Sequence, residues 1–138
     1  RAGRLLQHAG RWHATLLEWV AGCLALRSGE LTTATGILKG ILGALEERPI
    51  NDGHLPACCV DVVASRVEAG RLDEASDLAA SYSELLARRG YPPAVLDGWA
   101  VVRDRVAVGR LPLTLLTPLG DYFRRAWIEP QTKLVLPA

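Results

Sequence analysis

The stretch Val67-Glu68-Ala69-Gly70-Arg71-Leu72-Asp73-Glu74-Ala75 predicts the corner of a helical hairpin. Apolar residues recur at helical spacing before Gly70 (Val60, Val63 and Val67) and again after it (Leu72, Ala75, Leu78, Ala79, Tyr82, Leu85 and Leu86). Glycine adopts the left-handed backbone that ends many helices at no steric cost, and Asp73 and Glu74 place negative charge in the first turn of the following helix. Two amphipathic helices are therefore expected to meet at Gly70.

The same pattern recurs at two other places, Ser28-Gly29-Glu30-Leu31-Thr32-Thr33-Ala34 and, more loosely, Val108-Gly109-Arg110-Leu111. The glycines of the three segments, Gly29, Gly70 and Gly109, follow one another at intervals of about 40 residues, a spacing typical of stacked helical hairpins. One hairpin cannot bury its apolar face without a neighbour, so we expect a short array of hairpins.

The Gly-x-Leu-x-x-Ala core of the first two segments resembles the tetratricopeptide-like (TPR-like) superfamily and its pentatricopeptide relatives. This core consists of Gly29, Leu31 and Ala34 in one segment and of Gly70, Leu72 and Ala75 in the other, and the resemblance covers about residues 12 to 110. It implies antiparallel hairpins stacked as a short right-handed array, with these residues as its structural corners. The chain departs from the family pattern in its longer period, in the absence of a Trp-x-x-Leu-Gly-x-x-Tyr first helix, and at Thr114, which stands where a third alanine would be.

Length and composition favour one all-α domain over residues 1–138. The chain has 138 residues, of which 49% are hydrophobic, enough for a sizeable core. Its formal net charge of +1 provides no overall field that would attract nucleic acid, a membrane or an acidic partner. No methionine occurs, so we expect a processed chain or a segment of a longer protein.

Apolar periodicity predicts about six helices. They cover residues 12–27, 30–47, 54–69, 72–89 and 93–108, and a shorter sixth helix covers 118–127, with Thr117 as its N-cap and Pro118 in its first position. Residues 1–10 are interpreted as the end of a preceding helix or as a frayed start. Pro112 and Pro118 make the C-terminal unit irregular. The extended apolar tail at 133–136 is expected to cover the end of the array, and an edge offered to a partner is the alternative.

Three glycines in the second predicted helix, Gly36, Gly40 and Gly43, predict the close approach of another helix. Each glycine costs up to about 1 kcal/mol relative to alanine inside a helix. A row of positions without side chains allows two backbones to come near, and such packing would offset this cost.

No residue is predicted to be catalytic, to hold a cofactor or to bind a metal. His54 and Cys58 share a helical face, but a structural zinc site needs four ligands in recognisable pairs, and the other histidines and Cys23 are scattered. The chain has no Gly-x-Ser-x-Gly motif, no phosphate-binding glycine loop and no His-Glu-x-x-His motif. We therefore expect a protein that is not an enzyme, in which Cys58 and Cys59 are small buried residues.

Arginine pairs raise the alternative of phosphate binding. They lie at positions 88 and 89, 103 and 105, and 124 and 125. Each pair is accompanied by acids or lies at the end of a predicted helix, where a cation is expected in any case, so nucleic acid is not the expected partner. Four tryptophans fall on the apolar stripes of their helices and are predicted to be core residues rather than a ligand platform: Trp12, Trp19, Trp99 and Trp127.

The leading functional hypothesis is a non-enzymatic protein-protein interaction module. Such a scaffold or adaptor would bind a peptide or helix of a partner protein in a groove lined by the first helices of the hairpins. Self-association is a further expectation. Single-stranded RNA binding, which the pentatricopeptide resemblance implies, and a ligand-sensing regulatory domain of a larger protein are the alternatives. The sequence does not locate the interaction surface.

Cysteine content and hydropathy indicate the compartment. Three cysteines leave at least one unpaired, and adjacent cysteines such as Cys58 and Cys59 rarely form a relaxed bridge. No stretch approaches the roughly 20 apolar residues that span a bilayer. We expect no membrane span and a cytoplasmic or other reducing intracellular compartment.

Overall fold

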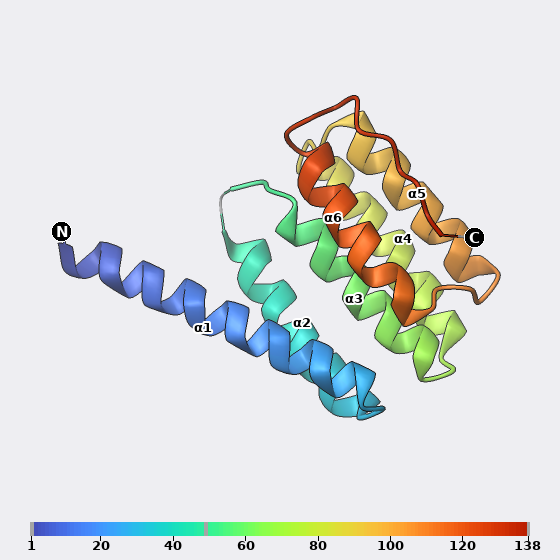
Figure 1. Ribbon diagram of the computed structural model, residues 1–138, viewed down its shortest axis with the longest axis horizontal. Coiled ribbons are helices and arrows are strands. Elements are labelled where there is room, and N and C mark those ends of the chain that lie inside the picture. Colours follow the sequence, from blue (N-terminus) through green and yellow to red (C-terminus); the bar gives the residue numbers. More distant parts are fainter. Residues whose placement is uncertain (1, 49, 138) are drawn as a thin grey trace.

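The computed structural model describes the backbone of residues 2–48 and 50–137 and the side chains of residues 10–48 and 50–137. Six α-helices form most of this part of the chain (Figure 1): α1 (Ala2–Arg27), α2 (Leu31–Glu47), α3 (His54–Glu68), α4 (Leu72–Arg88), α5 (Pro93–Ala107) and α6 (Leu116–Ala126). A 3-10 turn, Leu113–Leu115, precedes α6. The described residues contain no strand, which confirms the predicted all-α class.

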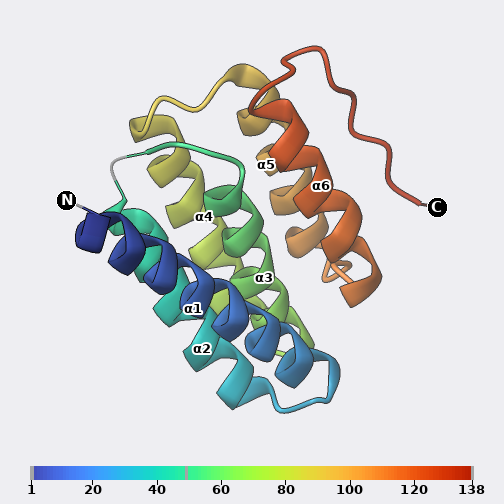
Figure 2. The same ribbon diagram turned by 60° about the vertical axis from the view of Figure 1, so that its left-hand side comes forward.

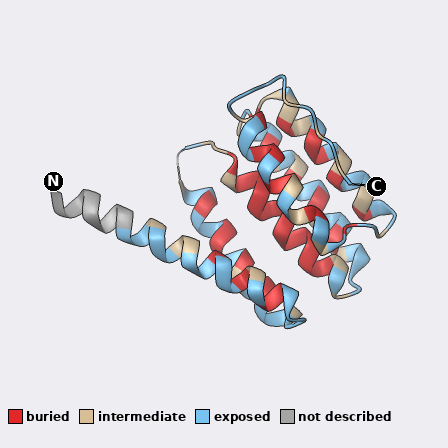
Figure 3. Cartoon of the chain, in the orientation of Figure 1, coloured by how far each residue is buried: buried red, intermediate tan, exposed pale blue. Residues whose placement is uncertain are grey.

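Helix α3 lies at the centre of the fold. It packs against its chain neighbours α2 and α4 and against α6 from the C-terminal part. Every residue from Leu55 to Arg66 is buried, so the helix is covered around its whole circumference (Figure 3). Its sequence is apolar on almost all sides, which is typical of a helix inside a core.

Successive helices form the expected array of packed hairpins. Helix α1 packs on α2, α2 on α3, α3 on α4 and α4 on α5. Helix α6 departs from this order, because it packs more extensively on α3 than on α5, its neighbour in the chain. The irregular C-terminal unit is therefore a helix folded back onto the centre of the array, and it does not extend the stack.

The corners at Gly29 and Gly70 have the left-handed backbone that glycine adopts without strain, with φ angles of 81° and 74°. At the second corner the N–H of Arg71 donates to the carbonyl oxygen of Arg66 at 2.9 Å, which is the hydrogen bond that closes a Schellman C-cap. Gly109 has the same backbone, with φ 67°. The three glycines that define the repeat spacing therefore all end a helix.

The other corner residues differ in burial. Ala34 and Ala75 have no exposed surface, and Leu31 is half-buried. Leu72 is 44% exposed. The two alanines therefore lie where neighbouring helices pack closely, whereas Leu72 lies at the surface of the corner.

The glycine row of α2 does not mark a helix contact, and that prediction is wrong. Gly36, Gly40 and Gly43 are exposed, and a Cβ atom added at any of them would meet no other atom within 4 Å. Helix α2 packs on α1 and α3 through its other faces. The close approach between α1 and α2 involves Gly22 instead, where an added Cβ would lie 3.0 Å from Cγ2 of Ile37.

Two predicted helix starts also differ from the structure. Helix α1 is continuous from Ala2, so the interpretation of the first residues as a separate helix end or a frayed start is wrong from Ala2 onward, and Arg1 lies outside the described residues. Helix α6 begins at Leu116, with Leu115 as its N-cap, so Thr117 is not the cap. Pro118 is the third residue of the helix, where its missing N–H removes no intrahelical hydrogen bond.

Arg89 ties the loop between α2 and α3 to the end of α4. Its guanidinium donates to the carbonyl oxygens of Glu46 and Arg48, both at 2.9 Å, and its Nε donates to Oδ1 of Asn51 at 2.8 Å. Carbonyl oxygens at the end of a helix have no partner within that helix, and this arginine provides one for α2. Phosphate binding was the alternative for this side chain, but the donors of Arg89 bind backbone carbonyl oxygens and the side chain of Asn51 within the protein.

The C-terminal tail lies against the helices with alternate side chains turned inward. Leu134 and Leu136 are half-buried and pack against the hydrophobic core, whereas Val135 between them is 80% exposed. The tail runs back past α6 (Figure 2). The tail therefore packs on the helices through two leucines, and its role as a cover for the end of the array stays a prediction.

Deletion of residues 132–138 is expected to lower the melting temperature of the isolated domain by several degrees. Leu134 and Leu136 would lose their contacts with the core, a loss of about 1 to 2 kcal/mol in the free energy of unfolding. Differential scanning calorimetry of the intact and truncated chains measures the change. An unchanged melting temperature would show that the tail does not stabilise the fold, and Val135→Ser, at an exposed tail position, is the control that should leave it unchanged.

Candidate functional site

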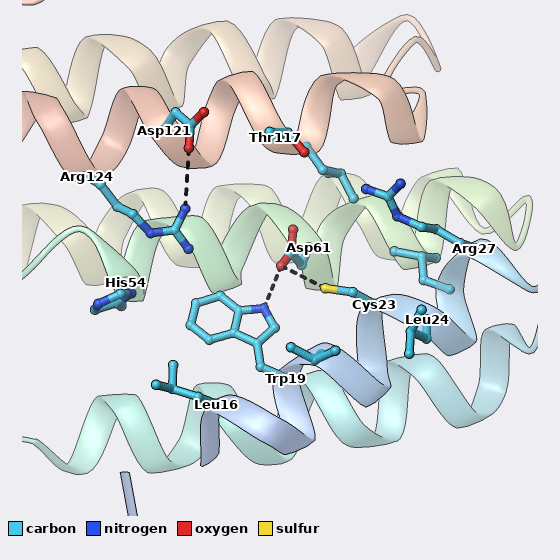
Figure 4. Close-up of a pocket in the computed structure, with 13 residues that line it drawn as sticks. Leu16, Trp19, Cys23, Leu24, Arg27, His54, Asp61, Thr117, Asp121 and Arg124 are labelled. Atoms are coloured by element: carbon cyan, nitrogen blue, oxygen red, sulfur yellow. Dashed lines mark hydrogen bonds and ion pairs between the residues drawn. The ribbon is translucent and has the colours of Figure 1, made fainter. Parts of the chain in front are cut away.

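A groove of about 380 Å³ lies between α1 and α6, with α3 as its floor (Figure 4). Its walls are mainly apolar, with Leu16, Val20 and Leu24 from α1 and Leu116 from α6. Its polar residues are Asp61 and His54 on α3, Arg27 on α1, and Thr117, Asp121 and Arg124 on α6. The groove exists because α6 packs on α3 and leaves the neighbouring face of α1 uncovered.

An apolar stripe of α1 has no cover from the described residues. Leu17, Val20 and Leu24 are 71%, 56% and 60% exposed, although their spacing of three and four residues places them on one side of the helix. Trp19, one residue away, is only 7% exposed because it turns toward α3. The helix is therefore apolar on two adjacent faces, of which only one is buried in this chain.

Asp61 is the polar centre of the groove floor and is only 8% exposed. Its Oδ2 atom accepts a hydrogen bond from the indole Nε1–H of Trp19 at 2.7 Å and a longer one from Sγ of Cys23 at 3.7 Å. Both donors come from α1, so the carboxyl group joins α1 to α3 across the groove (Figure 4).

Burial raises the pKa of Asp61 from its ordinary value of 3.8 to about 6. The hydrogen bond from Trp19 and the positive charges of Arg124 and Arg27 oppose this rise and favour the charged form, but burial outweighs them. No cationic group of the described residues forms an ion pair with Asp61. Burial and the neighbouring carboxylate also raise the pKa of Cys23 to about 12, so this side chain is a thiol at neutral pH.

Aromatic and cationic side chains close one end of the groove. His54 lies edge-on to Trp12 and Trp19, with ring centroids 5.3 Å and 6.0 Å apart, and burial lowers its pKa. The guanidinium of Arg124 lies 5.8 Å from the ring centroid of Trp19, and Nη1 of Arg124 lies 4.0 Å from Oδ1 of Asp121. His54 is thus a packing partner of two tryptophans here, and its ring is largely uncharged at neutral pH.

Replacement of Asp61 by asparagine is expected to stabilise the folded protein at neutral pH. The folded state binds the Asp61 proton more tightly than the unfolded state, so the contribution of this group to stability falls as the pH rises from about 4 to about 6. Asp61→Asn removes this loss while it keeps an oxygen that accepts from Trp19. The variant should exceed the parent by up to about 3 kcal/mol at pH 7.5, and the difference should shrink toward about pH 4.

Urea denaturation of both proteins across this pH range measures the difference. The comparison removes the titration of His54, whose surroundings are the same in both chains, and Cys23 stays a thiol throughout this pH range. Asp77→Asn, at an exposed position on α4, is the control and should change stability little at any pH. A variant less stable than the parent at pH 7.5 would show that the charge of Asp61 stabilises the fold.

The residues weighed as metal ligands do not come together. His54 lies among the tryptophans, whereas the Sγ atom of Cys58 points to the carbonyl oxygen of Leu38 at 3.6 Å and Cys59 is fully buried. All three cysteines of the chain are free thiols. Among the described side chains there is no group of three His, Cys, Asp or Glu residues that could hold a metal ion.

The four tryptophans, all predicted to be core residues, differ in burial, and one of them lines the groove. Trp99 is 1% exposed, and its Nε1 donates to the carbonyl oxygen of Ala79 at 2.8 Å, as expected of a core residue. Trp127 and Trp12 are half-buried. Trp19 is buried and also lines the groove, so the distinction between a core residue and a binding residue does not hold for it.

Sequence reasoning missed the polar centre of the groove. Asp61 stands between Val60 and Val62, inside a run of apolar residues from Pro56 to Ala64. A charged side chain within the most apolar helix of a chain is a signal, because burial of an unpaired charge is costly. That signal would have marked Asp61, but it would not have identified Trp19 or Arg124 as its neighbours.

Comparisons with protein-family models, with curated protein sequences and with solved structures found no match to this chain. The description of the groove therefore depends on its own geometry. In the part of the chain that the structure describes, every helix is too short or too polar to cross a membrane.

Proposed function

We propose that this chain is a non-enzymatic interaction module of TPR-like type that binds a helix of a partner protein in the groove between α1 and α6. The observation that carries the proposal is the uncovered stripe of Leu17, Val20 and Leu24 beside the groove. A contiguous exposed apolar surface next to a groove is typical of a protein interaction site. An amphipathic helix recognises such a surface through apolar side chains at helical spacing.

The length of the stripe favours a helix over a small ligand. Leu17 and Leu24 are seven positions apart on α1, which corresponds to about 10 Å along the helix axis. Leu17 lies outside the lining of the groove, so a small molecule in the cavity would leave it in water. The convergence of Asp61, Arg27 and Arg124 on the cavity is the observation that supports a ligand-sensing domain as the second candidate.

Charge distribution argues against single-stranded RNA in this groove. The floor bears the carboxyl group of Asp61, and Asp121 adds a second acid on the α6 side. These two acids balance the charges of Arg27 and Arg124, so the groove has no excess of positive charge to attract a phosphate backbone. The free thiols of all three cysteines support a reducing compartment as the place where the module works.

Selection from a displayed library of helix-forming peptides tests the proposal. Peptides that bind the protein should share apolar residues at positions i, i+3 or i+4, and i+7. Val20→Glu and Leu24→Glu, which place charges on the stripe, should each weaken binding about ten-fold or more. Val108→Glu is the matched control, because Val108 is also an exposed valine, 65% accessible, but does not line the groove.

Two results would contradict the proposal. One is a selection without enriched peptides, or with peptides that bind Val20→Glu as tightly as the parent. The other is dimerisation of the chain that Val20→Glu abolishes, measured by sedimentation equilibrium, because the stripe would then be covered by a second copy of this chain.

A further inference from the structure

The carboxyl group of Asp61 has one oxygen free of hydrogen bonds. Both donors that reach it, Nε1 of Trp19 and Sγ of Cys23, contact Oδ2. No hydrogen bond from a described residue reaches Oδ1, which points away from both donors in Figure 4. Trp19 and Cys23 are neutral, so this buried carboxylate is held in place by hydrogen bonds but is not neutralised by an ion pair.

A neutral side chain would join α1 to α3 equally well, because an amide oxygen also accepts from an indole N–H. A charged group at a buried site costs free energy unless a cation pairs with it. Burial raises the pKa of Asp61 to about 6, so the group is charged at neutral pH despite this cost. A carboxylate with a free oxygen at the floor of an open groove is therefore suited to bind a cation that comes from outside the chain.

Charges alternate along the groove. In Figure 4, Arg124 lies on one side of Asp61 and Arg27 lies on the other, each from a different wall. Both arginines are exposed, and Arg124 is drawn toward Asp121. Asp121 offsets part of the charge of Arg124 but leaves it exposed. Arg124, Asp61 and Arg27 thus follow one another as positive, negative and positive, and the complementary partner has a cation between two acids.

We propose that the groove selects a lysine side chain of the partner helix, whose ammonium group binds Oδ1 of Asp61 while its methylene stem lies against Val20 and Leu24. This inference rests on the proposed function, since the partner helix carries the lysine. Acidic residues of the partner, one turn before and one turn after the lysine, pair with Arg27 and Arg124. The apolar walls fit the stem because lysine buries its methylene groups along apolar surface and keeps only its head polar.

The free oxygen favours lysine over arginine. A guanidinium binds a carboxylate best through two parallel hydrogen bonds, one to each oxygen. At Asp61 the Oδ2 atom already accepts from Trp19 and Cys23, so only Oδ1 remains. An ammonium group is a compact charge that needs only one acceptor oxygen at this position.

Binding of n-butylammonium, which reproduces the lysine side chain, tests the inference without a peptide. The readout is the indole N–H resonance of Trp19 in nitrogen-15 NMR spectra, assigned with Trp19→Phe. Butylammonium should shift this resonance saturably, with a Kd on the order of 1–10 mM for so small a molecule. Neutral n-butanol, which has the same four-carbon stem, and anionic n-butyrate, whose alkyl stem is one carbon shorter, should bind about ten-fold more weakly or not at all.

Asp61→Asn separates a binding role from a structural one. The variant keeps the acceptor for Trp19, so it should fold, and it should lose the preference for butylammonium over butanol. Preference for butyrate, absence of a saturable shift with butylammonium, or an unchanged preference for butylammonium in Asp61→Asn would overturn the inference.

The peptide selection distinguishes this failure from failure of the proposed function. One outcome is a set of groove peptides that lose affinity for Val20→Glu but bind equally well when their lysine is replaced by norleucine. This outcome would refute the lysine subsite, and the proposed helix-binding function would still hold. Charge-selective binding of butylammonium without any groove peptide would support the cation subsite and refute the helix-binding function.

Discussion

Gly53→Ala is expected to destabilise the protein by about 3 to 4 kcal/mol, because the added methyl group has no room. A Cβ atom at this position would lie 2.4 Å from Cα and 2.8 Å from the backbone N of Arg124, and 2.8 Å from the carbonyl oxygen of Phe123. These are backbone atoms of α6, so no side-chain rotation relieves the overlap. Helix α6 would have to move away from α3.

The denaturant midpoint in urea measures this loss. Gly36→Ala is the matched control, because its added methyl group meets no atom within 4 Å and it lies inside α2. Alanine there should stabilise the protein by up to about 1 kcal/mol. A Gly53→Ala variant with an unchanged midpoint would show that α6 does not pack against the start of α3, and the groove of Asp61 and Arg124 would not exist as described.

Ala75→Asp is expected to cost about 4 kcal/mol or more and to leave the domain largely unfolded at ordinary temperature. Ala75 has no exposed surface and lies in the first turn of α4, where this helix packs on α3. A carboxylate at this site would be buried away from water with no cation or hydrogen-bond donor placed to pair with it, which is among the most costly changes in a core. Circular dichroism at 222 nm during urea denaturation measures the effect.

Ser76→Asp is the control on the same helix. Ser76 is exposed, so the same acidic side chain remains in water there, next in sequence to the buried position. Its stability should stay within about 0.5 kcal/mol of the parent. Equal stability of Ala75→Asp and the parent would show that the corner at Gly70 is open and that α3 and α4 do not pack through Ala75.

Helix boundaries were predictable where the evidence for them is local. The end of α3 and the start of α4 differ from their expected positions by at most one residue, because a positive-φ glycine and an apolar periodicity on each side act within a few residues. The start of α6 was not predictable in this way. Thr117-Pro118 is a good local signal for an N-cap, but the 3-10 turn before it leads directly into the helix at Leu116.

The glycines of α2 show that a row of small residues on one helix does not by itself identify a contact with another helix. Gly36, Gly40 and Gly43 form the row that close helix packing uses, yet they are exposed. Gly53 falls between two predicted helices and belongs to no such row, yet a Cβ atom added there would meet backbone atoms of α6. Which glycine is in contact depends on where the rest of the chain lies, and a sequence pattern on one helix does not contain that information.

Local features of the sequence specify the helical class, the corners at Gly29, Gly70 and Gly109, and an apolar face on each helix, because turn chemistry and hydrophobic periodicity act between near neighbours. The return of α6 to α3, without extensive contact with α1, is a result of long-range packing. That choice depends on the fit of surfaces about 60 residues apart in the chain, and local preferences do not specify such a fit. It opens the groove, exposes the α1 stripe and places Asp61 on its floor.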